Sequence, residues 1–476
     1  MEFYNILPQL VLLAMACVVL LVDAFHPKQK GFRVTYALTQ GTLIVAAVFS
    51  AMLYGEGSHT VFSGNFIRDR LTSVVEVFVF ISMFITLLVS RRYILQRKGM
   101  ARGEYYILAL FSTLGMTLLA GGHTLLMIYL GLELMSLPLY AMVAFNRDNP
   151  KATEAAMKYF IMGAIASGML LYGMSMVFMA TGHLDLSNIR ALATAPQPLM
   201  LTYGMVFILI GIAFKLGAAP FHMWVPDVYD GAPVSVTMMV GSAPKIAAFA
   251  MAVRLLVDML PAMKAEWQPL LIFLTMLSIG VGSVIAIAQS NIKRLFAYSG
   301  IAHMGYMLLG ILAGTAAGYS ASLFYVLTYA LTATAGFTLL TIMSHQGFEC
   351  ENIEDLKGLH QRNPWLALMM LFIVFSMAGV PPFIGFFAKV AVIKALLDAH
   401  FLVVPIIAIV FAIIGLFYYL RVVKVVYFDQ ADTQTPVAWH MDTRVMLTIN
   451  SVALLVFGIV PGVLFTLTQH VFLQAL

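Results

Sequence analysis

Long apolar stretches separated by short polar loops make up most of this sequence. A helix that crosses a membrane needs about 20 mostly apolar residues, and the chain contains fourteen such stretches. They lie near residues 4–24, 34–54, 71–90, 105–120, 124–145, 152–180, 200–225, 233–258, 268–289, 293–314, 319–344, 364–398, 403–428 and 445–474. The pattern predicts an all-α polytopic membrane protein with about 14 transmembrane helices.

Glycine and proline interrupt the seventh and twelfth stretches. Gly217 and Pro220 fall within the seventh, and Gly379, Pro381 and Pro382 fall within the twelfth. Proline removes a backbone donor and blocks the preceding helical turn, so helices 7 and 12 are expected to be discontinuous. A pair of interrupted spans is a sequence sign of an ion pathway in transporters.

The two interrupted stretches are five spans apart, which predicts two five-helix repeats. Because five is odd, the second repeat would have the inverted orientation, and Lys215 and Lys389 would then be equivalent positions. The expected segments are residues 1–104 (helices 1–3), 105–258 (first repeat, helices 4–8), 259–428 (second, inverted repeat, helices 9–13) and 429–476 (a loop and helix 14).

The composition excludes several classes of protein. Hydrophobic residues make up 61% of the chain and charged residues only 10%, whereas a soluble domain carries about 25% charged residues. A soluble enzyme, a nucleic-acid binder and a disordered scaffold are therefore excluded. The two cysteines cannot hold an iron–sulfur cluster, which needs about four ligands, and no nucleotide-binding or hydrolytic motif occurs.

Lysine and arginine are distributed unequally between the two sets of loops. With an outer N-terminus, fifteen fall in cytoplasmic loops and four in outer loops. Cytoplasmic loops carry the excess of these residues, so both termini are expected on the outer side. The longest polar stretch, residues 345–363, is expected to be a solvated connection on the cytoplasmic face, with a contact to a partner as the alternative.

Five ionisable residues inside predicted spans, each in a different span, are the candidates for a functional role: Glu133, Lys158, Lys215, Lys245 and Lys389. A charge at the bilayer centre costs about 2.5–3.5 kcal/mol on insertion scales, and such residues usually mark an ion or proton path. Lys245 is about 12 residues into its span, roughly 18 Å along the helix and so near mid-bilayer. Lys158 lies closer to the start of its span, from where its side chain can reach the interface.

Buried lysines suit proton exchange. Burial disfavours the charged form, and a neighbouring carboxylate favours it again. Glu133 and Lys158 are the expected pair, and a row of such lysines would form a proton relay. Each charge that crosses the membrane works against about 2.3 kcal/mol per 100 mV, so a partner must supply the energy.

Four further residues are candidates for supporting this relay. His222 and His303 would bridge lysines through water, because imidazole titrates near neutral pH, or would be packed polar residues. Lys293 opens its span at the cytoplasmic face, where the positive-inside rule alone would place it. Tyr298 would donate a hydrogen bond inside the bundle.

Three segments resemble one known family. The texts FKLGAAPFHMWVPDVYDGAPVSVTMMVGSAPKIAAF, QSNIKRLFAYSGIAHMGY and AGVPPFIGFFAKV resemble the antiporter-like membrane subunits of respiratory complex I (NADH:quinone oxidoreductase). Those subunits are related to multisubunit sodium/proton antiporters. The resemblance covers nearly the whole chain.

The resemblance implies a proton-translocating subunit of this enzyme complex. Glu133 and Lys158 resemble the family's ion pair, Lys215 and Lys245 its central lysines, and Lys389 the lysine at the outlet side. His222, Lys293, Tyr298 and His303 resemble the polar axis between them.

The resemblance also implies cofactors, partners and location. NADH, FMN, iron–sulfur clusters and quinone would belong to partner subunits, with no cofactor in this chain. The partners would be other membrane-arm subunits, including antiporter-like neighbours, and membrane lipids, with no nucleic acid. The location would be the bacterial inner membrane, with both termini on the periplasmic side.

Two alternatives stay open. One is a subunit of a multisubunit cation/proton antiporter, which the PDVYDGAP text disfavours. The other is a structural membrane subunit without a channel, which leaves the lysines and the glutamate inside the spans unexplained.

Overall fold

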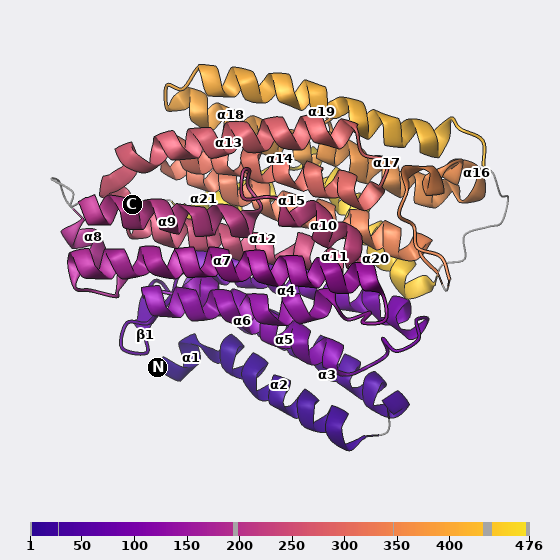
Figure 1. Cartoon of the computed structure of the whole chain (residues 1–476), viewed down its shortest axis with the longest axis horizontal. Coiled ribbons are helices and arrows are strands. Elements are labelled where there is room, and N and C mark those ends of the chain that lie inside the picture. The colour runs from indigo at the N-terminus through magenta and orange to yellow at the C-terminus, as the bar shows by residue number, and fades with distance from the viewer. Residues whose placement is uncertain (1, 27, 194–198, 346, 432–439, 473–476) are drawn as a thin grey trace.

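The chain folds into a bundle of long helices that run roughly along one axis (Figure 1). The computed structural model describes residues 2–26, 28–193, 199–345, 347–431 and 440–472. Within these residues, thirteen helices are long and apolar enough to cross a membrane. The predicted all-α membrane fold is confirmed.

The elements before the first break include one short antiparallel hairpin, β1–β2. In chain order they are α1 (Glu2–Asn5), α2 (Leu7–Phe25), α3 (Lys28–Met52), η1 (Leu53–Gly55), β1 (His59–Val61), β2 (Phe66–Arg68), α4 (Arg70–Leu95), α5 (Glu104–Gly121), α6 (Leu125–Val143), α7 (Pro150–Thr181), α8 (Leu186–Leu192) and α9 (Leu199–Leu216).

The elements after the first break are all helical. They are α10 (Trp224–Gly231), α11 (Val234–Gly241), α12 (Ala243–Ala252), η2 (Val253–Asp258), η3 (Pro261–Met263), α13 (Lys264–Ile287), α14 (Ile292–Ala313), α15 (Ala316–Met343), η4 (Ile353–Leu356), α16 (Leu359–Arg362), α17 (Pro364–Ala378), α18 (Ile384–Asp398), α19 (Val403–Tyr427), α20 (Met441–Ile459) and α21 (Gly462–Phe472).

Both predicted breaks are present. The seventh span divides into α9 and α10. The twelfth span divides into α17 and α18, and these two helices have 15 residues each. Gly217 and Gly379 adopt positive φ angles of 72° and 80° at these breaks, a conformation that glycine adopts without a steric penalty. The thirteen long helices and the divided twelfth span together account for the fourteen predicted spans.

Two further spans are divided that were expected to be continuous. The eighth is interrupted at Ser242, between α11 and α12, and ends as the π-helical turn η2. Pro244 lies in the first turn of α12 and has no backbone N–H to continue the hydrogen bonds of α11, so the sequence contained a signal for this break. The last span is likewise divided at Pro461, between α20 and α21.

Side chains cap several helix starts in the loops. The caps satisfy backbone donors that have no partner in the first helical turn. At each of these starts the cap side chain accepts a hydrogen bond from a backbone N–H: Asp69 for α4, Thr124 for α6, Asn149 for α7, Asn291 for α14, Thr315 for α15 and Asn363 for α17.

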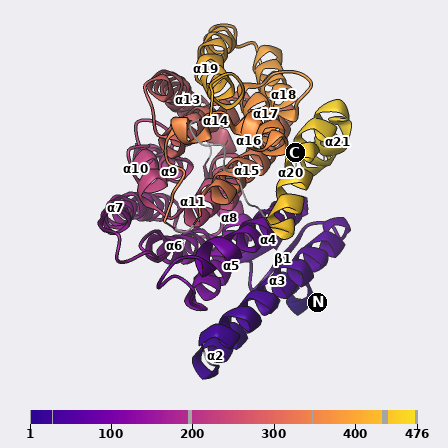
Figure 2. The ribbon, with the colours of Figure 1, turned by 90° about the vertical axis from the view of Figure 1, so that its right-hand side faces the viewer.

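The core lies around the eighth, tenth and eleventh spans. In the most apolar 18-residue segment of each span, 100% of the residues are buried in the eighth span and 94% in the tenth and eleventh. The corresponding values are 28% for α2 and 33% for α19. The end-on view shows α11, α14 and α15 inside the bundle, with α2 and α19 at its edges (Figure 2). Lys245 therefore lies on the most enclosed span.

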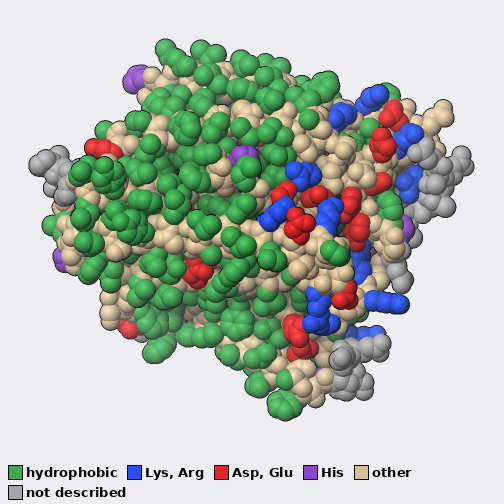
Figure 3. All heavy atoms as spheres, viewed as in Figure 1, with side chains coloured by type: hydrophobic (Ala, Val, Ile, Leu, Met, Phe, Trp, Pro, Cys, Tyr) green, Lys and Arg blue, Asp and Glu red, His purple; other side chains and the backbone are tan. Residues whose placement is uncertain are grey.

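Charged side chains gather at one end of the bundle, and the middle of the visible face is apolar (Figure 3). The start of α2 and the end of α21 lie at the opposite end (Figure 1). An apolar middle suits the lipid interior, and an excess of charge at one end is typical of the cytoplasmic side of a membrane protein.

A fully buried ion pair joins the first helices. Arg68 Nη1 lies 2.6 Å from Glu76 Oε2, and both side chains are 0% exposed. Ser50 Oγ donates to the same carboxylate at 2.5 Å, and Arg68 Nε donates to the Asn5 carbonyl at 2.8 Å. Gln9 also donates to Glu76. Glu76 lies inside the third predicted span, yet it was not among the expected buried charges.

Removing Glu76 should destabilise the chain strongly. Glu76→Ala leaves the Arg68 guanidinium buried without its counter-charge, which costs about 3–5 kcal/mol of unfolding free energy. Chemical unfolding of the detergent-solubilised chain measures this. The control is Arg92→Ala, because the Arg92–Asp442 pair is 41% and 34% exposed and contributes at most about 1 kcal/mol. Equal losses for the two variants would contradict the prediction.

Candidate functional site

Lys215 lies in the last turn of α9, just before the first break. Its side chain is buried, and its Nζ donates to Ser136 Oγ at 2.6 Å and to the Tyr140 hydroxyl at 3.4 Å. Both acceptors come from α6. Glu133 is one turn before Ser136 on the same helix, so it shares this face.

Lys245 binds the end of the helix that carries Lys215. Its Nζ donates to the Leu216 carbonyl at 2.9 Å and to the Lys215 carbonyl at 3.4 Å. The last carbonyls of a helix lack intrahelical donors, so Lys245 caps the C-terminus of α9. The ammonium also lies 5.0 Å from the centroid of the Trp224 ring, and that indole donates to the Phe214 carbonyl at 3.0 Å.

Lys389 makes the corresponding contact at the second break. Its Nζ donates at 2.7 Å to the carbonyl of Ala378, the last residue of α17. The ammonium lies 5.3 Å from the centroid of the Tyr306 ring. In this respect Lys389 resembles Lys245, which caps a helix end, more than Lys215, which binds hydroxyl groups.

His303 lies beside Lys389. Its Nδ1 is 2.7 Å from the Tyr325 hydroxyl, and its Nε2 is 3.1 Å from the Tyr419 hydroxyl. A cavity of about 10 Å³ is lined by His303 and Lys389 together with Tyr306 and Tyr419, close to the volume that one water molecule needs. The structure therefore brings these two predicted residues into one polar cluster.

His222 and Tyr298 lie close together, near the first break. Their ring centroids are 6.5 Å apart, and His222 is buried. Among the described contacts, His222 Nδ1 has no hydrogen-bond partner. His222 belongs to the link between α9 and α10, and Tyr298 to α14, the helix that also carries His303.

The expected pair of Glu133 and Lys158 is wrong. Lys158 Nζ lies 2.8 Å from Glu154 Oε1 and 2.9 Å from Asp227 Oδ2, with its side chain 41% exposed. Glu154 is one turn away on α7, and the break in the seventh span brings α10 with Asp227 to the same place. Glu133 Oε1 is buried and has no hydrogen-bond partner in the described part of the chain.

Lys293 is buried rather than solvated at the membrane face. It is 2% exposed, and its Nζ donates to the Asp230 carbonyl at 2.6 Å and lies 3.3 Å from Glu351 Oε1. The stretch 345–363 is accordingly not a simple solvated connection. Glu349 accepts a hydrogen bond from Tyr93 at 3.0 Å and pairs with Arg97.

The sequence reasoning missed several polar residues of this region. Asp227 and Asp230 are both in the PDVYDGAP text, which contributed to the resemblance but not to the set of ionisable candidates. Asp227 binds Lys158 and Arg294, each at 2.9 Å. Asp227 and Asp230 follow the predicted break in the seventh span closely, and this position could have marked them as candidates.

A second missed group lies at the opposite end of the bundle. Arg254, which is 3% exposed, lies 2.8 Å from both Asp69 Oδ2 and Asp258 Oδ2 and donates to the Ala120 carbonyl at 3.1 Å. A cavity of about 480 Å³ opens beside this network. Arg254 and Asp258 fall within the eighth predicted span, so composition alone marked them as unusual.

Comparison with known families agrees with this architecture. A family model described as "NADH:quinone oxidoreductase/Mrp antiporter, TM" matches residues 122–417, more than half of the chain. The chain is 49% identical over 469 residues to NADH-quinone oxidoreductase subunit N of Thioalkalivibrio sulfidiphilus, covering 98% of this chain and 97% of that protein. It is 50% identical over 466 residues to subunit N of Acidithiobacillus ferrooxidans, covering 97% and 96%.

Solved structures with the same fold include a chain of respiratory complex I from Thermus thermophilus with bound aureothin. It is 31% identical, with a TM-score of 0.84, and the match covers 97% of this chain and 99% of that one. A chain of the Mrp complex from Dietzia sp. is 19% identical, with a TM-score of 0.87 and coverage of 99% and 97%, and therefore shares the fold. The chain belongs to the NADH:quinone oxidoreductase/Mrp antiporter family of membrane subunits, in the group of subunit N of NADH-quinone oxidoreductase.

Proposed function

We propose that this chain passes protons across the membrane arm of NADH:quinone oxidoreductase through Lys215, Lys245 and Lys389. The observation that carries the proposal is the set of partners of these three ammonium groups. They donate only to backbone carbonyls and hydroxyl groups, and none of them takes part in an ion pair of the described residues. Each is a charge within a membrane bundle without a directly bound counter-charge.

This arrangement makes both protonation states of the lysines usable. An unpaired charge away from water is costly, so the neutral amine becomes accessible. An ammonium has three donors and no acceptor, and the neutral amine keeps two of those donors. Lys245 and Lys389 therefore still cap their helix ends after they release a proton, and the breaks survive the transfer.

Glu133 and Lys158 lie near the row of Lys215, Lys245 and Lys389 on different helices, Glu133 on α6 and Lys158 on α7. Glu133 places a carboxylate on the face of α6 that binds Lys215. Lys158 binds Asp227 in the first turn of α10, and Trp224, the first residue of the same helix, lies beneath Lys245. His222 and Tyr298 connect the first break to α14, His303 extends the path to Lys389, and Lys293 connects it to the charged end.

Partner subunits supply the driving energy in this proposal. NADH, FMN, iron–sulfur clusters and quinone react there, and their redox steps provide the roughly 2.3 kcal/mol per 100 mV that each transferred charge requires. In the bacterial inner membrane, the charged end of the bundle faces the cytoplasm and both termini face the periplasm.

Substitutions of Lys245 can test proton transfer separately from the capping of α9. In the assembled complex, Lys245→Arg keeps donors for the Leu216 carbonyl, but arginine hardly deprotonates. We expect Lys245→Arg, Lys245→Ala and Glu133→Ala to assemble and to lower the protons pumped per NADH oxidised several-fold. Acidification of inverted vesicles, measured together with NADH oxidation, tests this.

Lys264→Arg is the matched control, because Lys264 also caps a helix-terminal carbonyl, that of Gly314 at 3.0 Å, outside the proposed row. It should pump at the wild-type ratio. Wild-type pumping by all the Lys245 and Glu133 variants would refute the relay. Pumping that requires sodium without NADH oxidation would instead favour a cation/proton antiporter.

The observed partner of Lys158 can be tested by a double-mutant cycle. Lys158→Met and Asp227→Asn should be non-additive in unfolding free energy, with a coupling of up to about 1 kcal/mol for this half-exposed pair. Lys158→Met combined with Glu133→Gln should be additive. Chemical unfolding of the detergent-solubilised chain supplies both cycles, and the reverse result would restore Glu133 as the partner.

Sidedness can be tested with single cysteines in a Cys17→Ser, Cys350→Ser background. Ser58→Cys and Lys98→Cys place exposed thiols at the two ends of the bundle. A membrane-impermeant maleimide added to spheroplasts should label position 58 and not position 98, and inverted vesicles should give the opposite pattern. Labelling with the sides exchanged would overturn the orientation.

A further inference from the structure

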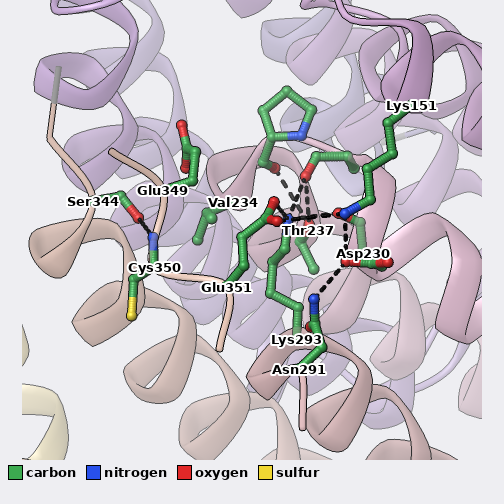
Figure 4. Close-up of polar contacts among 12 residues, drawn as sticks. Lys151, Asp230, Val234, Thr237, Asn291, Lys293, Ser344, Glu349, Cys350 and Glu351 are labelled. Atoms are coloured by element: carbon green, nitrogen blue, oxygen red, sulfur yellow. Dashed lines mark hydrogen bonds and ion pairs between the residues drawn. The ribbon is translucent and has the colours of Figure 1, made fainter. Parts of the chain in front are cut away.

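The loop after α15 crosses the charged end of the bundle and covers Lys293 (Figure 4). Its backbone is held against the start of α14, because Ile292 N donates to the Glu351 carbonyl at 2.7 Å and Ile353 N donates to the Ser290 carbonyl at 2.9 Å. The position of Glu351 over Lys293 is therefore fixed by the backbone.

The two carboxylate oxygens of Glu351 face different environments. Oε1 lies 3.3 Å from Nζ of Lys293, whose side chain is 3% exposed. Oε2 lies 3.4 Å from Nζ of Lys151, whose side chain is 46% exposed. Glu351, itself 32% exposed, thus connects solvent to an enclosed amine, and Figure 4 shows its carboxylate near the ends of both lysine side chains.

Beyond Lys293, the contacts lead toward the first break. Its Nζ donates to the carbonyls of Asp230 and Ala232, at 2.6 and 3.4 Å. The hydroxyl of Thr237, on α11, donates to the same Ala232 carbonyl at 3.4 Å. The eighth span then continues through its break to Lys245.

We propose that Glu351 is the residue through which protons enter this chain from the charged end. The proposal rests on the relay proposed above and adds its entrance. The carboxylate binds a proton from bulk water on the side of Lys151. The carboxylic O–H bond then breaks as an N–H bond forms on the neutral Nζ of Lys293, which leaves a carboxylate and an ammonium.

Four charged groups lie around this step. Lys151 and Lys293 face the carboxylate directly, and Asp230 Oδ1 lies 3.0 Å from Lys151 Nζ. Arg294 Nη1 lies 3.9 Å from Asp230 Oδ2. When Lys293 is neutral, Lys151 still offsets the charge of the Glu351 carboxylate.

Anchoring of the loop does not explain the position of Glu351. Glu349, two residues earlier, already ties the loop to Tyr93 on α4 and to Arg97 just after that helix. The Glu351 backbone N–H is also bound, because it donates to Asp355 Oδ2 at 2.9 Å. The same loop therefore provides a control carboxylate that anchors it without touching Lys293.

The experiment compares carboxylate variants in the assembled complex. Glu351→Gln keeps the shape and a hydrogen-bond acceptor but cannot carry the proton. We expect Glu351→Gln and Glu351→Ala to lower the protons pumped per NADH several-fold with normal assembly. Glu349→Gln and Glu349→Ala should pump at the wild-type ratio.

Sodium formate is the probe that separates entry from anchoring. As a small weak acid that carries protons, formate should restore pumping by Glu351→Ala in a concentration-dependent way and leave Glu349→Ala unchanged. A loss in Glu351→Ala that formate does not restore, with normal pumping by Glu351→Gln, would show a purely structural role and overturn the proposal.

Lys245→Ala in the same series keeps the two proposals distinguishable. If Lys245→Ala loses pumping and both Glu351 variants pump normally, the entrance is wrong and the relay stands. If Lys245→Ala also pumps normally, the relay itself fails, and the entrance fails with it.

Discussion

The rest of this structure depends on how carbonyls freed at helix breaks are satisfied inside an apolar bundle. Within a membrane, backbone groups need protein or water partners. Here, lysine side chains supply the donors. Lys245 binds the end of α9, and Lys389 binds the end of α17. The groups proposed to move protons are thus also the groups that let these helices stop inside the bundle.

This double role explains why the breaks and the ionisable residues occur together. At these two breaks, an unbroken helix would leave the ammonium groups of Lys245 and Lys389 without these acceptors, and loss of the lysines would leave the Leu216 and Ala378 carbonyls without these donors. Lys215 differs because it binds hydroxyl groups of α6. Lys215 therefore depends on side chains of α6 and not on the carbonyls of a helix end.

The short helix α10 connects the interior to the charged end. Its first residue, Trp224, lies beneath Lys245, and its carboxylates reach Lys158 and Lys151. Lys293 binds carbonyls at its other end. α10 therefore extends from the first break to the charged end of the bundle. The buried ion pair of Arg68 and Glu76 holds the N-terminal helices together and does not involve α10.

The sequence by itself determined the number of spans, the breaks in the seventh and twelfth, and the lysines beside them. These follow from local properties, namely apolar length, proline and residue type. Only the tertiary structure decided which groups meet, because partners depend on helix rotation and on which helices are neighbours. Lys158 pairs with Asp227 and not with Glu133 since the first break turns α10 toward α7. Lys293 lies under Glu351 because a loop distant in sequence folds over α14, and no local pattern specifies that contact.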